Sequence, residues 1–196
     1  LYQLKKTEER LQHEIEHGKK IQKDAESVWN WSSPAGQVRA ERRAHLFVEV
    51  AKITNNDAVL EIGCGTGLFT RKVFQKTGAN ITATDLSPEL LGQAKEILPQ
   101  ATFIVDDAMK MNFPDNTFDV VFGSSVLHHL EMDVALSEIY RVLKPGGRMV
   151  FAEPNMVNPQ ILIQKNIPYI KEKLGDSPDE TAIFRWSFKK LMNSLR

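Results

Sequence analysis

The sequence is poor in cysteine, since Cys64 is the only one among 196 residues. A single cysteine forms no disulfide within the chain, and no group of cysteine and histidine residues has the spacing of a zinc site. We therefore expect no metal ion. Because disulfides accumulate in oxidising compartments, the scarcity of cysteine favours a cytoplasmic location.

The sequence also lacks an excess of charge and a long apolar segment. Lys and Arg together number 25, and so do Asp and Glu. A neutral chain has no overall field that would attract nucleic acid or an anionic membrane, so we expect neither partner. No apolar run approaches the roughly 18 residues that cross a bilayer.

The residues that are present predict one globular domain made of three consecutive segments. Hydrophobic residues make up 42% of the chain and charged residues 26%, which is ordinary for a protein with a sizeable core. Residues 1–56 are predicted to form an N-terminal helical segment, residues 57–154 the core, and residues 155–196 a C-terminal segment of short helices broken by prolines.

The N-terminal segment is predicted to hold two helices. Leucine, isoleucine and valine recur at helical spacing from about residue 3 to residue 28, which predicts one long amphipathic helix. Residues 29–34 break this pattern, and a second helix is predicted from about residue 36 to residue 51. The long helix has two interpretations: it packs on the core or on a partner subunit of a homodimer, or it forms a lid over a substrate.

The core segment alternates between strands and helices. Apolar runs predict five strands, at residues 58–62, 81–84, 102–105, 118–123 and 148–152. Helical patterns occupy residues 67–76, 87–98 and 132–143, and a turn is predicted at 144–147. This alternation implies a Rossmann-like, doubly wound, mostly parallel sheet of the α/β class. Ligands bind such sheets at the carboxyl ends of the strands, so the residues that follow each strand form the candidate site.

Three glycines at alternate positions follow the first predicted strand. Gly63, Gly65 and Gly67 let the backbone turn tightly and let a ligand approach atoms that a Cβ would cover. Asp85 closes the second strand, 18 residues beyond Gly67, at the position where an acidic side chain accepts the hydroxyls of a ribose. Ser87, rather than Asp85, is the predicted N-cap of the next helix. The loop and the acid together predict a site for a ligand that contains a ribose.

Six segments of the core form an ordered set, at residues 59–67, 83–87, 107–108, 113–121, 127–130 and 141–147. This set resembles the motifs of the class I S-adenosylmethionine-dependent methyltransferase family, in its small-molecule branch, and it covers about residues 57–154. The resemblance implies the class I methyltransferase fold, which ends with two further strands. None is recognisable before Arg196, so we expect either that the chain is truncated and lacks them or that another chain covers the exposed edge of the sheet.

The resemblance implies S-adenosylmethionine (SAM) as the cofactor. Glu61 and the glycine loop would surround its methionine part, Asp85 would hold the ribose hydroxyls, and Asp107 would accept from the adenine amino group. Asp106 is less specific, since a solvated turn residue also fits its position. The full implied cofactor-binding set is Glu61, Gly63, Cys64, Gly65, Gly67, Asp85, Leu86, Asp107, Ala108, Met109 and Ser124.

The expected reaction is transfer of a methyl group from SAM to an O, N or C atom of a small-molecule acceptor. Because the sulfonium already activates the methyl group, the main task of the protein is positioning and desolvation. A general base is needed only where the acceptor arrives protonated, and His128 and His129, after the fourth strand, are the catalytic candidates. The alternative is that these histidines only pack or cap the following helix.

Residues outside these motifs suggest where the acceptor binds. Trp29 and Trp31 are expected to wall a pocket, and Arg39 is expected to contact the SAM carboxylate or an acidic substrate. Arg42 and Arg43 are expected on a solvated helix face. Three residues after the fifth strand are expected to line the acceptor site, namely Glu153, Pro154 and Asn155.

Three other functions compete with this one. A NAD-binding oxidoreductase shares the first two glycines, but its fingerprint needs a third glycine at the position of Leu68. An RNA or protein methyltransferase is disfavoured by the neutral charge and by the sequence Ser124-Ser125-Val126-Leu127, where such enzymes carry Asn/Asp-Pro-Pro-aromatic. A SAM-binding regulatory module without catalysis would keep the glycine loop and both carboxylates, and stays open.

Overall fold

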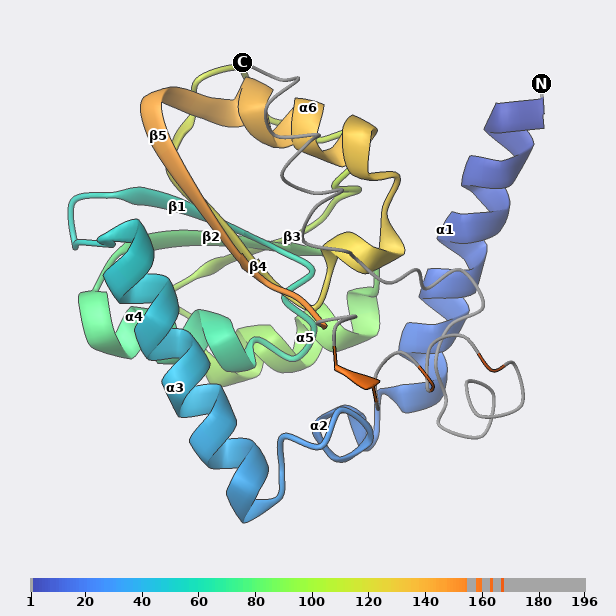
Figure 1. The fold of residues 1–196 in the computed structure, drawn as a ribbon, viewed down its shortest axis with the longest axis horizontal. Coiled ribbons are helices and arrows are strands. Elements are labelled where there is room, and N and C mark those ends of the chain that lie inside the picture. Colours follow the sequence, from blue (N-terminus) through green and yellow to red (C-terminus); the bar gives the residue numbers. More distant parts are fainter. Residues whose placement is uncertain (1, 155–157, 160–162, 164–166, 168–196) are drawn as a thin grey trace.

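Five parallel strands form the centre of the structure, a computed structural model that describes residues 2–154, 158, 159, 163 and 167 (Figure 1). In chain order the elements are α1 (Tyr2–Ile21), α2 (Ala25–Val28), α3 (Pro34–Ala51), β1 (Ala58–Ile62), α4 (Leu68–Thr77), β2 (Asn80–Asp85), α5 (Pro88–Ile97), β3 (Thr102–Val105), β4 (Phe118–Ser124), the 3-10 turn η1 (Leu127–His129), α6 (Met132–Val142) and β5 (Leu143–Ala152).

The strand order of the sheet is β3-β2-β1-β4-β5, and every neighbouring pair is parallel. This arrangement confirms the predicted Rossmann-like, doubly wound α/β fold. Its strand order reverses between β1 and β4, which is the place where ligands bind such sheets. The predicted absence of two final strands concerns residues 155–196, most of which lie outside the described residues, as do the predicted C-terminal helices.

Helices cover both faces of the sheet. Alternate strand residues point to opposite faces, so Val59 and Phe122 join the core cluster under α3 and α4, while Leu60 and Val121 join the cluster under α6. On the first face the ring of Phe47 from α3 lies 5.3 Å from that of Phe122. Burial on both faces explains why the strands read as continuous apolar runs.

Two prediction errors concern where elements begin and end. The single long helix predicted for residues 3–28 is wrong: α1 ends at Ile21 and α2 begins at Ala25. The backbone carbonyl of Gln22, in the break, accepts a hydrogen bond from Gln93 of α5. The fifth strand begins at Leu143, not at residue 148, because Leu143 already pairs with Phe118 across an irregularity in the ladder.

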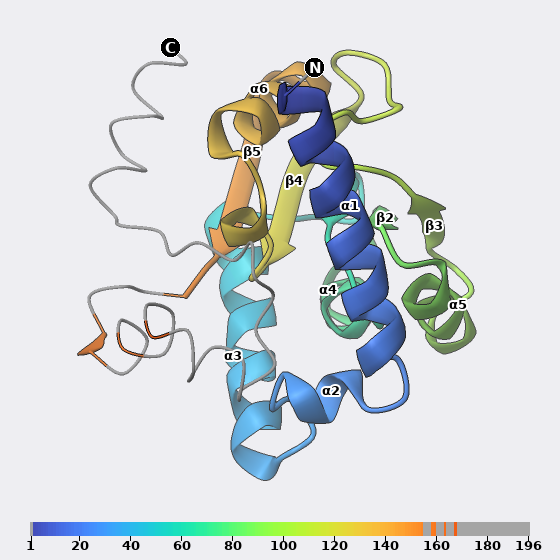
Figure 2. The ribbon, with the colours of Figure 1, turned by 90° about the vertical axis from the view of Figure 1, so that its right-hand side faces the viewer.

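Helix α1 lies beyond the carboxyl ends of the strands in Figure 1 and crosses in front of the sheet in Figure 2. The short helix α2 and the turn before α3 connect α1 to the core. Ser33 caps α3 by accepting from the Gly36 N–H at 3.0 Å. None of the described helices has the length and apolar character that a membrane span requires.

Candidate functional site

A cavity of about 630 Å³ opens at the carboxyl ends of the strands. Its walls come from the loops after β1, β2, β3 and β4 and from the N-terminal helices α1 and α2. The cavity therefore lies at the end of the sheet where the fold class predicts a ligand. Its lining includes Trp29 and Trp31, as expected for an aromatic wall.

The glycine loop after β1 needs glycine for steric reasons. Gly63 and Gly65 have φ angles of 65° and 53°, in the left-handed region that side chains disfavour. A Cβ at Gly63 would lie 2.5 Å from a methyl carbon of Val126, and one at Gly65 would lie 2.8 Å from the Trp29 ring. Gly67 is the N-cap of α4 and does not line the cavity. The loop thus brings backbone atoms to the cavity wall.

Asp85, at the end of β2, both lines the cavity and fixes the loops beside it. Its Oδ2 accepts from the Gly65 N–H at 2.8 Å, and its Oδ1 accepts from the Ser87 N–H at 2.9 Å. Burial raises the pKa of Asp85, while these backbone hydrogen bonds oppose the rise. Since each carboxylate oxygen has two lone pairs, both can still accept from hydroxyls of a ligand.

Glu61 lies apart from the predicted residues that line the cavity. Its side chain is buried under the glycine loop, where Thr70 of α4 donates to Oε2 at 2.5 Å, and it does not line the cavity. Burial raises the pKa of Glu61 to about 8; the Thr70 hydrogen bond opposes this rise and the nearby Asp85 adds to it. Glu61 therefore joins β1 to α4 beneath the loop.

After β3, Asp106 and Asp107 have separate partners. Asp107 accepts from the Arg10 Nη2 at 3.0 Å on both oxygens, and its Oδ1 also accepts from the Met109 N–H. Asp106 is buried and accepts from the backbone and side chain of Asn112, so the interpretation as a solvated turn residue is wrong. Both aspartates line the cavity.

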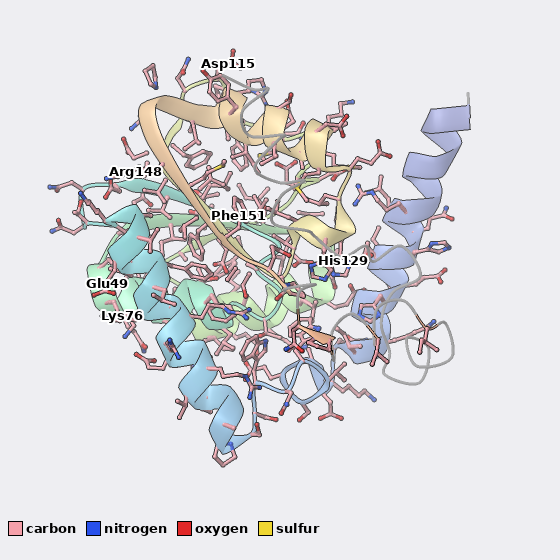
Figure 3. All side chains as sticks on the ribbon, viewed as in Figure 1. Glu49, Lys76, Asp115, His129, Arg148 and Phe151 are labelled. Carbon is pink, nitrogen blue, oxygen red and sulfur yellow. The ribbon has the colours of Figure 1, made fainter. Side chains whose placement is uncertain are left out.

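The two candidate histidines lie in η1, after β4, and both line the cavity. His128 Nδ1 lies 2.7 Å from Glu153 Oε2, and Glu153 Oε1 accepts from the Val126 and Leu127 N–H groups at 3.0 Å. Figure 3 shows His129 on the side of the sheet that faces α1, and its Nδ1 lies 3.2 Å from Glu14 of that helix. Glu153 thus holds the start of η1 and the ring of His128 together.

Arg43 corrects the expectation of a solvated helix face. It is half-buried, donates to Ser124 Oγ at 2.7 Å, and lies over the Trp31 ring at 4.9 Å. Arg42 is exposed, as expected. Arg39 is also exposed and donates to the Asn30 carbonyl, so it does not line the cavity.

The structure brings most of the predicted site together. Glu61, Gly67, Met109 and Glu153 do not line the cavity, and Asn155 lies outside the described residues. The following predicted residues do line it: Gly63, Cys64, Gly65, Asp85, Leu86, Asp107, Ala108, Ser124, His128, His129 and Pro154. Sequence reasoning missed Arg10 and Glu14 in the lining and missed Glu153 as the partner of His128. Arg10 and Glu14 resemble any solvated helix residue, because their partners are about a hundred residues away in the chain.

These features define a protein that binds a nucleoside. A glycine loop without side chains, a carboxylate at each of two successive strand ends, and a cavity of this size fit an adenosine with an amino-acid extension. Leu68 is buried in the core beside the loop, where a dinucleotide fingerprint needs glycine. The site therefore fits SAM better than NAD.

Comparisons with known proteins agree with this class. The family described as "Methyltransferase domain" matches residues 60–151. A demethylmenaquinone methyltransferase of Streptomyces griseus is 38% identical over 170 residues, which cover 76% of this chain and 73% of that protein. The chain therefore belongs to the class I SAM-dependent methyltransferase family, and its cofactor is SAM.

Two further comparisons define how far this similarity extends. A 2-methyl-6-phytyl-1,4-hydroquinone methyltransferase of Synechocystis is 41% identical over 101 residues, which cover 50% of this chain but 32% of that protein. The methyltransferase solved in complex with the Haloferax volcanii Trm112 activator has a TM-score of 0.71 and 21% identity over 87% of this chain and 74% of that one, and shows the shared fold. The chain spans about a third of several curated relatives that it matches.

Proposed function

We propose that this chain transfers a methyl group from SAM to an O, N or C atom of a small-molecule acceptor. One observation carries the proposal: the glycine loop, Asp85, Asp107 and His128, which Glu153 holds by its Nδ1, all border the same cavity. A site for the cofactor and a candidate proton acceptor thus share one cavity. SAM supplies an electrophilic methyl group when bound.

The proposed cofactor contacts follow from the groups on the cavity wall. Asp85 accepts from the ribose hydroxyls, because it borders the cavity and each of its oxygens keeps a lone pair beside the backbone N–H that it already accepts. Asp107 accepts from the adenine amino group through Oδ2, whose only protein donor among the described residues is Arg10. Gly63, Cys64, Gly65 and Ser124 border the methionine part, and Leu86 and Ala108 the adenine. Glu61, Gly67 and Met109 support this set from behind.

The proposed role of His128 is that of a general base for a protonated acceptor. Glu153 Oε2 lies 2.7 Å from Nδ1, so it fixes the orientation of the ring. The proton-accepting atom in this proposal is Nε2, which takes the acceptor proton as the acceptor atom attacks the methyl carbon. His129 is placed by Glu14 from α1 and is proposed to close the same side of the cavity.

The segment division is also a proposal. Residues 57–154 form the cofactor-binding core, and residues 1–56 form a cover, because Arg10, Glu14 and Trp29 of that segment border the cavity. We further propose a cytoplasmic enzyme without a nucleic-acid partner, on the basis of the single cysteine and the balanced charge, with a homodimer as a candidate assembly. Sedimentation analysis and RNA-binding assays test the last two points.

Two measurements test the function. Calorimetry with S-adenosylhomocysteine (SAH) first tests the cofactor site. A panel of acceptors, beginning with demethylmenaquinone and 2-methyl-6-phytyl-1,4-hydroquinone, then tests transfer of a radiolabelled methyl group from SAM. Binding together with methylation supports the enzyme, whereas binding without methylation of any panel member favours the regulatory module. A folded chain that does not bind SAH overturns both.

A further inference from the structure

Arg10 of α1 is a charged side chain with an unusual environment. It is 7% exposed and borders the cavity. Its Nη2 donates to both oxygens of Asp107 at 3.0 Å. Within the described part of the chain, its Nε and Nη1 are buried and have no hydrogen-bond partner.

Buried guanidinium donors without partners are costly, because they have lost their hydration and received nothing in exchange. Proteins leave such groups mainly where water or a ligand completes them. Arg148 Nε is the other buried side-chain donor without a partner among the described residues. Figure 3 places Arg148 at the opposite end of the sheet from His129, and Arg148 does not line the cavity. Among the buried side chains of the described residues, only Arg10 combines unpartnered donors with a place on the cavity wall.

The location of Arg10 selects the ligand atom. Its guanidinium is held on Asp107, the carboxylate proposed for the adenine amino group. On adenine, the amino group is flanked by two ring nitrogens, N1 and N7, which are hydrogen-bond acceptors. A carboxylate next to a guanidinium therefore presents an acceptor beside a donor, which complements an amino group beside a ring nitrogen.

We propose that Arg10 reads the adenine of the cofactor by donating to a ring nitrogen that flanks the amino group, and that adenosine thereby holds α1 over the site. The inference rests on the proposed cofactor contacts of Asp107. It assigns specificity for the base to the N-terminal helix as well as to the core. It also couples cofactor binding to the position of α1 over the site, because adenine supplies the missing hydrogen-bond acceptor for Arg10 of that helix.

The test compares ligands and variants by calorimetry. The ligands are SAH and its 1-deaza and 7-deaza analogues, each of which lacks one flanking nitrogen. The variants are Arg10→Met and Lys20→Met. The first replaces the guanidinium by an uncharged, unbranched side chain, and the second removes a charge from an exposed position of the same helix. Circular dichroism verifies that both variants fold.

We expect Arg10→Met to bind SAH about tenfold more weakly or worse, the scale of a lost hydrogen bond to a charged donor, and Lys20→Met to bind normally. One deaza analogue binds the wild-type chain weakly, and Arg10→Met removes that difference. The inference is overturned if each analogue loses as much affinity, relative to SAH, in Arg10→Met as it does in the wild type. A wild-type chain that binds no SAH instead overturns the proposed function itself.

Hydrogen exchange gives a readout of α1 that does not depend on activity. In the wild type, SAH should slow exchange of the α1 amides, and the affected deaza analogue should slow it less. In Arg10→Met, SAH should protect the glycine loop and leave α1 as it is without ligand. Equal protection of α1 in wild type and Arg10→Met would refute the coupling.

Discussion

At the residue scale, Asp85 combines two tasks, because it fixes the loops on either side and faces the cavity. We predict that Asp85→Asn weakens SAH binding by about 1–3 kcal/mol, the cost of losing hydrogen bonds to a charged group. Asp85→Ala should weaken it more, since the Gly65 and Ser87 N–H groups also lose their partner. Calorimetry measures both, and Asp115→Asn, an exposed position paired with Arg141, is the control. Unchanged affinity in both Asp85 variants removes this residue from the site.

Glu61 is predicted to make stability depend on pH. Its pKa rises from 4.5 to about 8 on folding, so its contribution is fully present below about pH 4.5 and is lost as the pH rises towards 8. Glu61→Gln cannot titrate. The unfolding free energy of the wild type should therefore fall relative to Glu61→Gln by at most about 1.4 kcal/mol per pH unit in this window. Denaturation at pH 5, 6.5 and 8 tests this, and a constant difference contradicts it.

Glu153 is predicted to control methyl transfer without affecting cofactor binding. In Glu153→Gln, the remaining oxygen can still accept from the Val126 and Leu127 N–H groups, but the amide nitrogen now faces His128 Nδ1. The ring must then carry its proton on Nε2, the atom proposed to accept one. For an acceptor that the wild type methylates on a hydroxyl, the rate of methyl transfer should fall about a hundredfold or more, while the affinity for SAH is unchanged. Glu96→Gln, exposed on α5, is the control, and an unchanged rate rejects His128 as the base.

The sequence predicted site residues only where a local pattern carries them. Asp85 and the glycine loop follow strands directly, so spacing alone places them at the cavity. Arg10 and Arg43 belong to helices with many charged residues. Their hydrogen-bond partners, Asp107 and Ser124, are distant in sequence, so no local pattern distinguishes these two arginines from solvated ones. Glu61 shows the opposite limit: its position in the motif was clear, but the strand alternation turned its side chain towards α4.

At the scale of elements, α3 offers a test of local stabilisation. Ser33 caps this helix at the Gly36 N–H, whereas the side chain of its neighbour Ser32 forms an exposed hydrogen bond with the Ser27 hydroxyl and caps no described helix. We predict that Ser33→Ala lowers the unfolding free energy by about 1 kcal/mol and that Ser32→Ala changes it by less than about 0.5 kcal/mol. Urea denaturation measures both. Equal effects would show that the cap contributes nothing specific.

The elements of the core were predicted closely because each has its own period and caps. Ser87 is the N-cap of α5 as predicted, and it accepts from the Leu90 N–H. The break between α1 and α2 was missed because neither glycine nor proline marks it and the apolar spacing continues through it. The break instead carries a tertiary contact, the hydrogen bond from Gln93 to the Gln22 carbonyl, which no local pattern announces.

At the scale of the whole molecule, the cofactor is predicted to stabilise the fold. Its proposed contacts join α1, the glycine loop and three strand ends, which come from the first 130 residues of the chain. SAH at a hundred times its dissociation constant should raise the unfolding free energy by about 2.7 kcal/mol. Thermal denaturation with and without SAH measures this change. The same concentration should stabilise Asp85→Asn less, and equal stabilisation would indicate binding elsewhere.

The only cysteine of the sequence lies in the middle of the glycine loop. Cys64 is buried, and burial together with the nearby Asp85 and Glu61 carboxylates raises the pKa of its thiol. Alkylating reagents attack the thiolate, so the closed loop should react very slowly and an opened loop quickly. The alkylation rate of Cys64, followed by mass spectrometry, therefore reports how often the glycine loop opens in the native chain, without any added label site.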